Sequence, residues 1–332
     1  PDDIFTAPEL RWAVIGCGVI ANQMAQSLAL AGRKLAGVAN RTLSKAQAFA
    51  EQYGIEKVYE SVEDLYADPG IDAVYITTPH NTHITYLRDA LAAGKHVLCE
   101  KAITLNSAEL DEARAIADEH NVVLMDATTV LHMPLYQELR RRMDAGEFGR
   151  MNLAQLNFGS YKEYGDLTNR FYNRNLAGGA MLDIGVYALS VMRLFMASQP
   201  IEVVSLGNTC ETGVDVAGGI VCRNAEQQLG VVSLTLHSKQ PKRSIISFDK
   251  CYIEVNEYPR ADHATIVWTA DGHREEVHAG TEAYALCYEM ADLEKAVAGD
   301  DSKREFLGYA SDVMELMTKL RADWGVVYPE EE

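Results

Sequence analysis

The sequence has few of the features that mark nucleic-acid-binding, membrane-spanning or secreted proteins. Its formal net charge is −18 over 332 residues, whereas nucleic acids and anionic membranes both attract a basic surface. No apolar run approaches the ~20 residues that a bilayer-spanning helix needs. Residues 1–9 are acidic and polar, unlike a signal peptide. We therefore expect a cytoplasmic protein whose partners include neither nucleic acid nor a membrane.

The six cysteines give no sign of a disulfide framework or a zinc site. None forms a C-x-x-C pair, and no group of cysteines and histidines has zinc-like spacing. Most lie in apolar, strand-like runs, which is typical of buried thiols in a reducing compartment. His80, His83 and His96 are near one another in sequence, but no Asp, Glu or Cys completes a convincing ligand set. We predict no metal site.

The length indicates two domains, because a domain usually takes roughly 100–200 residues. Over residues 1–128, short apolar strands alternate with amphipathic helices, which is typical of βαβ units in a parallel sheet. Asn106 and Glu109 form a capping-box pattern at the start of one helix. We predict a doubly wound, Rossmann-type NAD(P)-binding domain. Its strands are expected near 10–18, 34–40, 57–59, 72–77, 96–99 and 122–127, and its helices near 19–31, 44–53, 62–66, 82–93 and 106–120.

After residue 130 the pattern changes to strands without intervening helices, which predicts a mostly antiparallel sheet. We assign residues 129–332 to an α+β domain for substrate binding and oligomerisation, with helices on one sheet face only. The open face predicts a homodimer or higher homo-oligomer. Val231, Ser233, Thr235 and His237 alternate along one strand but are mixed in character, so they leave undecided which face is open. Strands are expected near 151–158, 201–206, 214–221, 229–236, 244–248, 251–255 and 265–269, and helices near 134–145, 182–196, 284–298 and 305–321.

A glycine-rich turn follows the first predicted strand and opens the first helix. Gly16, Gly18 and Ala21 give the pattern G-x-G-x-x-A, in the context that a dinucleotide-binding fingerprint requires. Gly16 permits the tight turn, Gly18 lets the backbone approach a pyrophosphate, and the helix start presents N–H groups to the anion. A purely structural glycine turn is the alternative. The cofactor contacts predicted here are Gly16, Cys17, Gly18, Val19 and Ile20.

The end of the second predicted strand reports on the type of cofactor. An acidic residue there would hold the ribose 2′-hydroxyl of NAD and repel the 2′-phosphate of NADP. This chain has Asn40 and Arg41 instead. Asn40 can bond a hydroxyl, and Arg41 can stack on adenine and pair with a phosphate, although it could also be an ordinary solvated arginine. We predict that NADP is favoured over NAD.

Three further motifs follow predicted strands or open a helix. Residues 77–83 read Thr-Thr-Pro-His-Asn-Thr-His, residues 100–102 read Glu-Lys-Ala, and residues 178–187 read Gly-Gly-Ala-Met-Leu-Asp-Ile-Gly-Val-Tyr. The first two lie beyond the carboxyl ends of parallel strands, where doubly wound sheets bind ligands. The side chains predicted to line the cofactor groove there are Thr78, Pro79, Asn81, His83, Glu100 and Lys101.

Together these motifs resemble the Gfo/Idh/MocA oxidoreductase family, and the resemblance covers nearly the whole chain. It implies a Rossmann domain, an open-faced sheet domain, a nicotinamide cofactor and no metal. The family's usual Glu-Lys-Pro, whose proline shapes the backbone beside the nicotinamide, is here Glu-Lys-Ala102. The third motif places an Asp and, four residues later, a His or Tyr; here they are Asp183 and Tyr187. The tyrosine version is similar to the dimeric dihydrodiol dehydrogenase branch, whose substrate we do not transfer.

Elementary chemistry supports catalytic roles for Lys101, Asp183 and Tyr187. Hydride transfer to a carbonyl leaves an alkoxide that needs a proton. A free phenol titrates near ~10, and a nearby lysine ammonium would lower that pKa. We predict Tyr187 as the acid/base, Lys101 as its tuner and substrate anchor, and Asp183 as the orienting residue. The alternatives are a helix-start cap for Asp183, a core tyrosine for Tyr187 and a solvated lysine for Lys101.

The predicted function is an NAD(P)-dependent oxidoreductase that moves a hydride between the nicotinamide and a small polyol, sugar, dihydrodiol or carbonyl compound. Tyr161 and Arg170 lie in a polar, aromatic stretch before the glycine turn and could contact that substrate or serve packing. Two other functions stay open. One is a glycosidase that uses NAD as a transient oxidant without net redox change, and the other is a non-catalytic cofactor-binding sensor.

Overall fold

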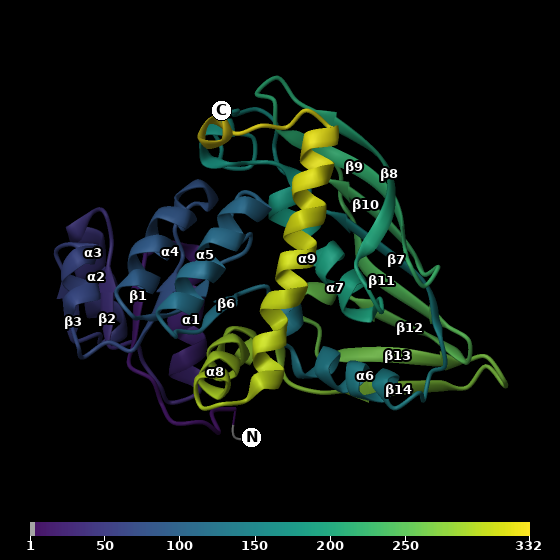
Figure 1. Ribbon diagram of the computed structural model, residues 1–332, viewed down its shortest axis with the longest axis horizontal. Coiled ribbons are helices and arrows are strands. Elements are labelled where there is room, and N and C mark those ends of the chain that lie inside the picture. Colours follow the sequence, from purple (N-terminus) through teal and green to yellow (C-terminus); the bar gives the residue numbers. More distant parts are fainter. Residues whose placement is uncertain (1–3) are drawn as a thin grey trace. The chain divides into compact units, whose positions relative to one another are not determined.

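The computed structural model describes residues 4–332; residues 1–3, part of the acidic stretch at the start, lie outside the described residues. The chain divides into two compact units (Figure 1). The first contains the residues up to Ala127 together with Ala283–Gly308, and the second contains Thr128–Glu282 and Tyr309–Glu332. The boundary after Ala127 is close to the one expected at residue 128. The second unit, however, is not one continuous stretch, because residues 283–308 group with the first.

The first unit contains a six-stranded sheet in the order β3-β2-β1-β4-β5-β6, in which all paired neighbours run parallel. The strand order reverses at β1, so crossovers to one side lead to β2 and β3 and those to the other lead to β4, β5 and β6. Right-handed crossovers then place helices on both faces, which confirms the predicted fold class. The strands are β1 (Trp12–Ile15), β2 (Gly37–Ala39), β3 (Lys57–Tyr59), β4 (Ala73–Ile76), β5 (His96–Cys99) and β6 (Leu124–Asp126), and the helices are α1 (Val19–Leu30), α2 (Leu43–Tyr53), α3 (Val62–Ala67), α4 (His83–Ala92) and α5 (Ser107–Glu119).

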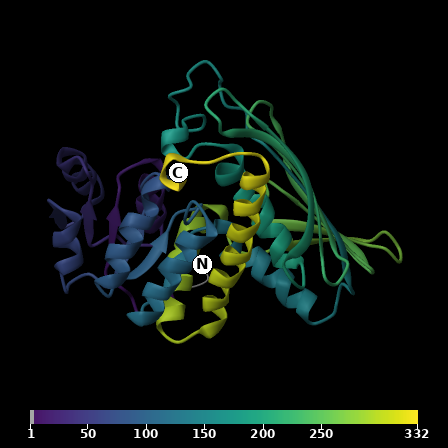
Figure 2. The same ribbon diagram turned by 45° about the horizontal axis from the view of Figure 1, so that its top comes forward.

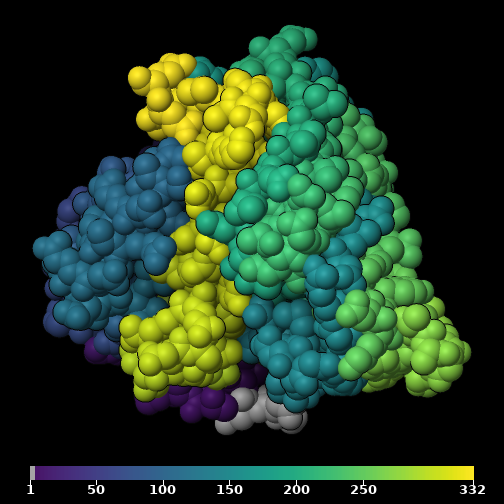
Figure 3. Space-filling model, turned by 45° about the vertical axis from the view of Figure 1, so that its right-hand side comes forward, coloured from purple at the N-terminus to yellow at the C-terminus, as the bar shows by residue number. Residues whose placement is uncertain are grey.

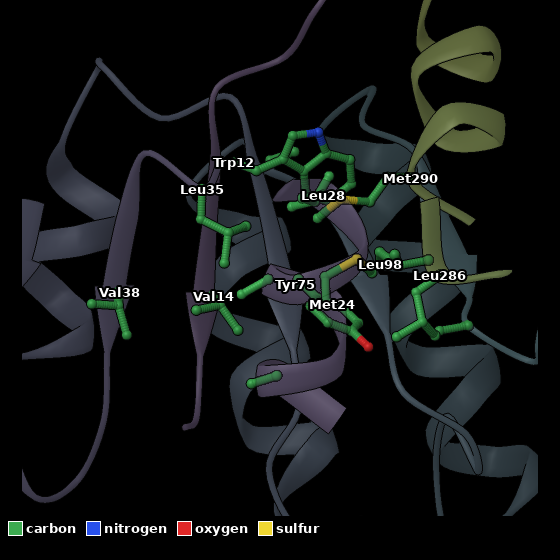
Figure 4. Packing of buried hydrophobic residues seen from close by; sticks show 14 of the residues in the cluster. Trp12, Val14, Met24, Leu28, Leu35, Val38, Tyr75, Leu98, Leu286 and Met290 are labelled. Atoms are coloured by element: carbon green, nitrogen blue, oxygen red, sulfur yellow. The ribbon is translucent and has the colours of Figure 1, made fainter. Parts of the chain in front are cut away.

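A helix from late in the sequence completes the core of the first unit. This helix, α8 (Ala285–Val297), packs beside α1. Figure 4 shows Leu286 and Met290 of α8 near Met24 and Leu28 of α1, and all four side chains are buried. Burying apolar area at roughly 25 cal/mol per Å² is the main source of stability for such a contact. Part of the apolar surface of α1 is therefore covered by α8.

A buried carboxylate fixes the same helix to the start of the chain. Glu294, whose side chain is fully buried, pairs with Arg33 at 2.8 Å. It also accepts hydrogen bonds from the indole N–H of Trp12 at 3.0 Å and from the main-chain N–H of Leu10 at 3.1 Å. Arg33 further contacts Glu9 at 3.2 Å. The carboxylate is thus held by several donors, as a buried charge requires.

The second unit contains an eight-stranded sheet in the order β14-β13-β12-β11-β7-β10-β9-β8. It is antiparallel except for the parallel pair β7 and β10, and Figure 2 shows helices along one side of it. The edge strand β14 (Arg274–His278) was not expected from the sequence. The other elements are β7 (Met151–Gly159), β8 (Pro200–Thr209), β9 (Asp215–Asn224), β10 (Leu229–Thr235), β11 (Gln240–Phe248), β12 (Cys251–Asn256), β13 (His263–Trp268), α6 (Pro134–Asp144) and α7 (Val186–Phe195). The long helix α9 (Asp301–Asp323) is divided between the units, because its residues up to Gly308 group with the first unit and the rest with the second.

Burial along the strands shows which face of this sheet is open. On β7, Ala154, Leu156 and Phe158 are buried on the face that α7 covers. On the opposite face, Val204, Val221 and Val231 lie side by side in the registers of β8, β9 and β10. Val204 is 75% exposed and Val221 is 46% exposed. In Figure 3, which shows one face of the molecule, teal and green atoms of the second unit lie at the surface. The open face is therefore the one that carries Val231 and Ser233.

One helical stretch in the described residues, Arg174–Phe195, is long and apolar enough to cross a membrane. In the structure, however, 78% of its apolar window is buried within the protein. Most of the buried part is α7, which packs on β7, β10 and β11. The stretch is the core helix of the second unit.

Candidate active site

The turn after β1 has the geometry that an anion-binding helix start needs. Gly16 has φ +103°, and a Cβ there would lie 2.5 Å from Thr77 Oγ1, so only glycine fits. Gly18 caps α1 with no atom within 4 Å of the position of a Cβ. No side chain caps this helix start and its first turn carries no acid, which leaves the N–H groups of Val19 and Ile20 available to a ligand. The turn fits the pyrophosphate of a dinucleotide.

Exposed cations follow β2, one in the loop after it and one in the first turn of α2. Arg41 and Lys45 are both exposed, and Arg41 makes no hydrogen bond or ion pair within the described part of the chain. Asn40 donates its side-chain N–H to Thr42 O at 3.0 Å, which orients the amide. Lys45 is close enough to lower the pKa of the Cys17 thiol, although burial dominates and raises that pKa to about 11. An exposed guanidinium and an exposed ammonium at this place suit a phosphate.

Two histidines support the loop that carries Lys101. His83 is fully buried, and its ring nitrogens lie 2.8 Å from Thr78 O and 2.9 Å from Ala102 O. His80 Nε2 lies 3.1 Å from Lys101 O. The Lys101–Ala102 peptide is cis. His83, which the sequence suggested as a cofactor contact, is thus engaged below the surface and joins the loops after β4 and β5.

The other groove residues predicted on these two loops differ in their exposure. Glu100 is buried and accepts hydrogen bonds from the hydroxyl of Tyr75 and, at 3.3 Å, from the main-chain N–H of Lys101. Its carboxylate therefore supports the loop from inside. Thr78 accepts a hydrogen bond from the hydroxyl of Thr82 at 2.8 Å. Thr78, Pro79, Asn81 and Lys101 are all at least partly exposed, so each can reach a bound ligand.

In the second unit, the glycine turn leads into a single π-helical turn, Met181–Gly185, which continues as α7. Single π-turns are frequent at functional sites. Asp183 lies in this turn and is nearly buried, with Arg170 at 4.0 Å from its carboxylate. Tyr187 follows in the first turn of α7 and is partly exposed. Its ring stacks on Phe158 of β7, with 6.1 Å between centroids.

Aromatic and cationic side chains surround these two residues within the second unit. The ammonium of Lys242 lies 5.2 Å from the ring centre of Phe158, and the guanidinium of Arg170 lies 4.2 Å from that of Phe171. Tyr161, a predicted substrate contact, is 61% exposed. Sequence reasoning missed Phe158, Phe171 and Lys242. No local pattern could have revealed them, because register and loop packing bring them to this position.

The sequence also missed Asp215, the first residue of β9. It is completely buried and accepts a hydrogen bond at 2.6 Å from the main-chain N–H of Met181. Burial raises the pKa of this carboxyl to about 6, against the opposing effect of the main-chain N–H groups and of Arg321. Within residues 4–332, no group of three or more His, Cys, Asp or Glu side chains could hold a metal ion. Of the predicted catalytic residues, Lys101 belongs to the first unit and Asp183 and Tyr187 to the second.

Comparison with known proteins identifies the family of both parts of the chain. Residues 10–128 match the family model for an oxidoreductase family with an NAD-binding Rossmann fold, and residues 136–254 match the C-terminal domain of the same family. The trans-1,2-dihydrobenzene-1,2-diol dehydrogenase of Mus musculus is 32% identical over 75% of each chain. The enzyme of that name from Sus scrofa is 28% identical over 97% of this chain and 99% of its own.

Solved structures share the fold. The aldose-aldose oxidoreductase of Caulobacter crescentus superposes with a TM-score of 0.82 at 20% identity, covering 95% of this chain and 98% of its own. The 3-ketoreductase KijD10 of Actinomadura kijaniata, in complex with NADP and TDP-benzene, gives a TM-score of 0.80 at 24% identity with the same coverage. The protein is an NAD(P)-dependent dehydrogenase or reductase that acts on CH–OH or C=O groups. The chain belongs to the Gfo/Idh/MocA oxidoreductase family.

Proposed function

We propose that the protein is an NADP-preferring oxidoreductase in which Tyr187 exchanges the proton while the substrate exchanges a hydride. The observation that carries this proposal is the start of α7, where a partly exposed tyrosine follows the nearly buried carboxylate of Asp183. When bound, the nicotinamide accepts or supplies the hydride. The chain then has to bind the substrate, orient its hydroxyl or carbonyl group, and move one proton.

Each predicted residue has one task in this scheme. Tyr187 gives a proton to the developing alkoxide, or takes one from the alcohol in the reverse direction. Lys101 stabilises the negative charge on the phenolate and on the substrate oxygen. Asp183, held beside Arg170 at 4.0 Å, orients the reacting group. At the cofactor, Arg41 binds the 2′-phosphate, and the helix start at Gly18 binds the pyrophosphate.

The side chains around Tyr187 support a cyclic substrate. Phe158 and Tyr187 stack with an interplanar angle of 22°, and Phe171 lies under Arg170. Phe158 is buried and holds the phenol ring of Tyr187 in place, whereas Tyr187 and Phe171 are partly exposed. Partly exposed aromatic rings of this kind provide flat apolar area for the face of a ring compound. The relatives are dehydrogenases of a dihydrodiol, and one structural neighbour is a 3-ketoreductase. We propose a ring compound with neighbouring hydroxyl or keto groups.

Three variants test the proton transfer. Tyr187→Phe removes only the hydroxyl, so NADP binding should survive while kcat falls about 10²–10⁴-fold. Lys101→Met should cost at least as much, and the double variant should be little worse than the poorer single variant if the two residues act as a unit. Tyr136→Phe, which also removes a tyrosine hydroxyl, is the matched control and should keep kcat. The assay is NADPH absorbance across a panel of aldoses, cyclic polyols, dicarbonyls and dihydrodiols. Near-normal turnover by Tyr187→Phe would exclude its assignment.

The open sheet face supports association with a second copy of the chain. Val204, Val221 and Val231 form an apolar row there, and Leu206 of the edge strand β8 is 83% exposed. Across β7 from this row, on β11 and β12, Arg243 pairs with Glu254 at 3.0 Å. Protein interfaces usually combine an apolar patch with polar or charged side chains around it. We propose a homodimer, or a higher homo-oligomer, through this face.

A further inference from the structure

The glycine turn before α7 is held by contacts from several elements of the second unit. The main-chain N–H of Gly178 donates to Asn173 O at 3.0 Å, and that of Gly179 donates to Phe171 O at 2.9 Å. The carbonyl of Gly179 accepts from the main-chain N–H of Asp183 at 3.3 Å. The position of Gly179 therefore sets the position of Asp183 directly.

Asp215 contacts the main chain where this helix begins. Its Oδ2 accepts from the N–H of Met181 at 2.6 Å. Its Oδ1 faces Gly179, where a Cβ could not fit, and no group within residues 4–332 bonds it in good geometry. A buried carboxylate with one unsatisfied oxygen is costly. At a helix start, however, its negative charge is favourably placed against the helix dipole.

The segment after α9 holds the other side of the same turn. The hydroxyl of Tyr328, which is fully buried, donates to Gly178 O at 2.7 Å. Tyr328 is held in turn by Glu331, whose carboxylate accepts from the Tyr328 N–H at 3.0 Å. Arg321, 2% exposed, binds both oxygens of Glu331 at 2.8 and 2.9 Å. These residues form a clamp that lies entirely within the second unit.

We infer that Asp215 and Tyr328 are positioning residues that fix the start of the helix carrying Asp183 and Tyr187. This inference rests on the proposed function in one respect, namely that Asp183 and Tyr187 are the catalytic residues. Asp215 accepts a hydrogen bond from Met181 and lies against Gly179, and Tyr328 donates a hydrogen bond to Gly178. The charge of Asp215 costs folding energy and serves the geometry of the site. Strained or unsatisfied groups that persist in a fold commonly have such a role.

The sign of the pH dependence follows from the burial of Asp215. Its pKa is raised from 3.8 to about 6, so the native state binds this proton more tightly than the unfolded chain. As pH falls from about 6 to about 4, protonation of Asp215 therefore makes its contribution to folding stability less unfavourable. Over the same pH range the ionised form of Asp215, which accepts the hydrogen bond from Met181, is lost. The groups that face it are the cation Arg321, the phenol Tyr328 and the main-chain N–H groups of Ala180 and Met181.

The test compares Asp215→Asn and Tyr328→Phe with the matched control Tyr136→Phe. Tyr136 is also fully buried and also donates its hydroxyl to a main-chain carbonyl at 2.7 Å, but that carbonyl is Tyr258 O, away from the glycine turn. We expect Asp215→Asn to lower kcat about ten- to a hundredfold, as a small misplacement of reacting groups does. Its Tm at pH 8 should not fall, and its Kd for NADP should stay within about twofold of the wild-type value.

The pH profile separates positioning from simple destabilisation. Wild-type kcat should fall as pH drops through about 6, and Asp215→Asn should lack this limb. Tyr328→Phe and Tyr136→Phe should lose similar amounts of Tm, but only Tyr328→Phe should lose kcat. Wild-type kcat and pH profile in Asp215→Asn would overturn the inference. If Asp215→Asn does not fold, equal kcat in the two Tyr→Phe variants would overturn it. Failure of the proposed function shows instead in Tyr187→Phe, so the two failures are distinguishable.

Discussion

Glu294→Gln tests whether α8 is part of the first unit. The carboxylate is fully buried and is held by Arg33, Trp12 and Leu10. Glutamine keeps the shape and can still accept from two of these donors, but its amide N–H group then faces the Arg33 guanidinium. Breaking a buried ion pair costs about 3–5 kcal/mol. In the variant, Arg33 still has Glu9 at 3.2 Å and the ring of Phe5 at 3.9 Å. We therefore expect a loss of unfolding free energy near the lower end of this range, about 3 kcal/mol.

Thermal and urea unfolding measure this effect. About 3 kcal/mol in a unit of this size lowers Tm by about 6–12 °C. The indole of Trp12 donates to Glu294 at 3.0 Å, so Trp12 contributes a local fluorescence signal, to which Trp268 and Trp324 of the second unit add. The matched control is Glu56→Gln, which breaks the exposed pair with Lys34 in the same unit and should leave the Tm unchanged within error. Equal transitions in Glu294→Gln and Glu56→Gln would refute the role given to α8.

Two further predictions concern the cofactor and the assembly. Arg41→Ala should weaken NADP binding about ten- to a hundredfold, which is the contribution of a charge-assisted hydrogen bond, and should have little effect on NAD binding, whereas Asn40→Asp should favour NAD. Isothermal titration calorimetry with both cofactors measures these affinities. Equal losses for the two cofactors in Arg41→Ala would indicate that Arg41 stacks on the adenine instead. Val221→Glu on the open sheet face should convert the oligomer to monomers, as measured by light scattering. The control Leu30→Glu, at another exposed apolar position, should leave the oligomer intact. A wild-type protein that is monomeric at micromolar concentration would refute the predicted assembly.

Most of the fold could be predicted because hydrophobic patterning is local. The strand His96–Cys99 was predicted with its observed bounds, since apolar runs between helical segments leave little choice in a parallel sheet. The strand β14, Arg-Glu-Glu-Val-His, was missed because only Val277 in it is buried. It lies at the sheet edge, where polar side chains are tolerated. The grouping of α8 with the first unit was also missed, because the contacts of Glu294 join residues more than 260 positions apart.

The site was predictable where a motif encodes backbone geometry. Gly16 needs a positive φ and Gly18 needs open space, and both requirements appear in the sequence as glycine. His83 was misjudged because a polar side chain in a functional loop can face inward, and only tertiary contacts show that it does. Asp215 was invisible for the same reason. An aspartate at the start of a strand is common, and its importance here comes from Met181, which lies 34 residues earlier in the chain.

The interleaving of the two units has a consequence for how the protein folds during synthesis. The ribosome delivers the six strands of the first sheet well before α8, so the apolar side chains of α1 that Leu286 and Met290 cover remain open meanwhile. The second unit likewise lacks Tyr328 and Glu331, which complete the clamp on Gly178, until after residue 320. Domains usually fold in order as they emerge. Here neither unit can complete its native contacts until the other is almost fully translated. Both units therefore reach their native contacts only near the end of translation, and at nearly the same time.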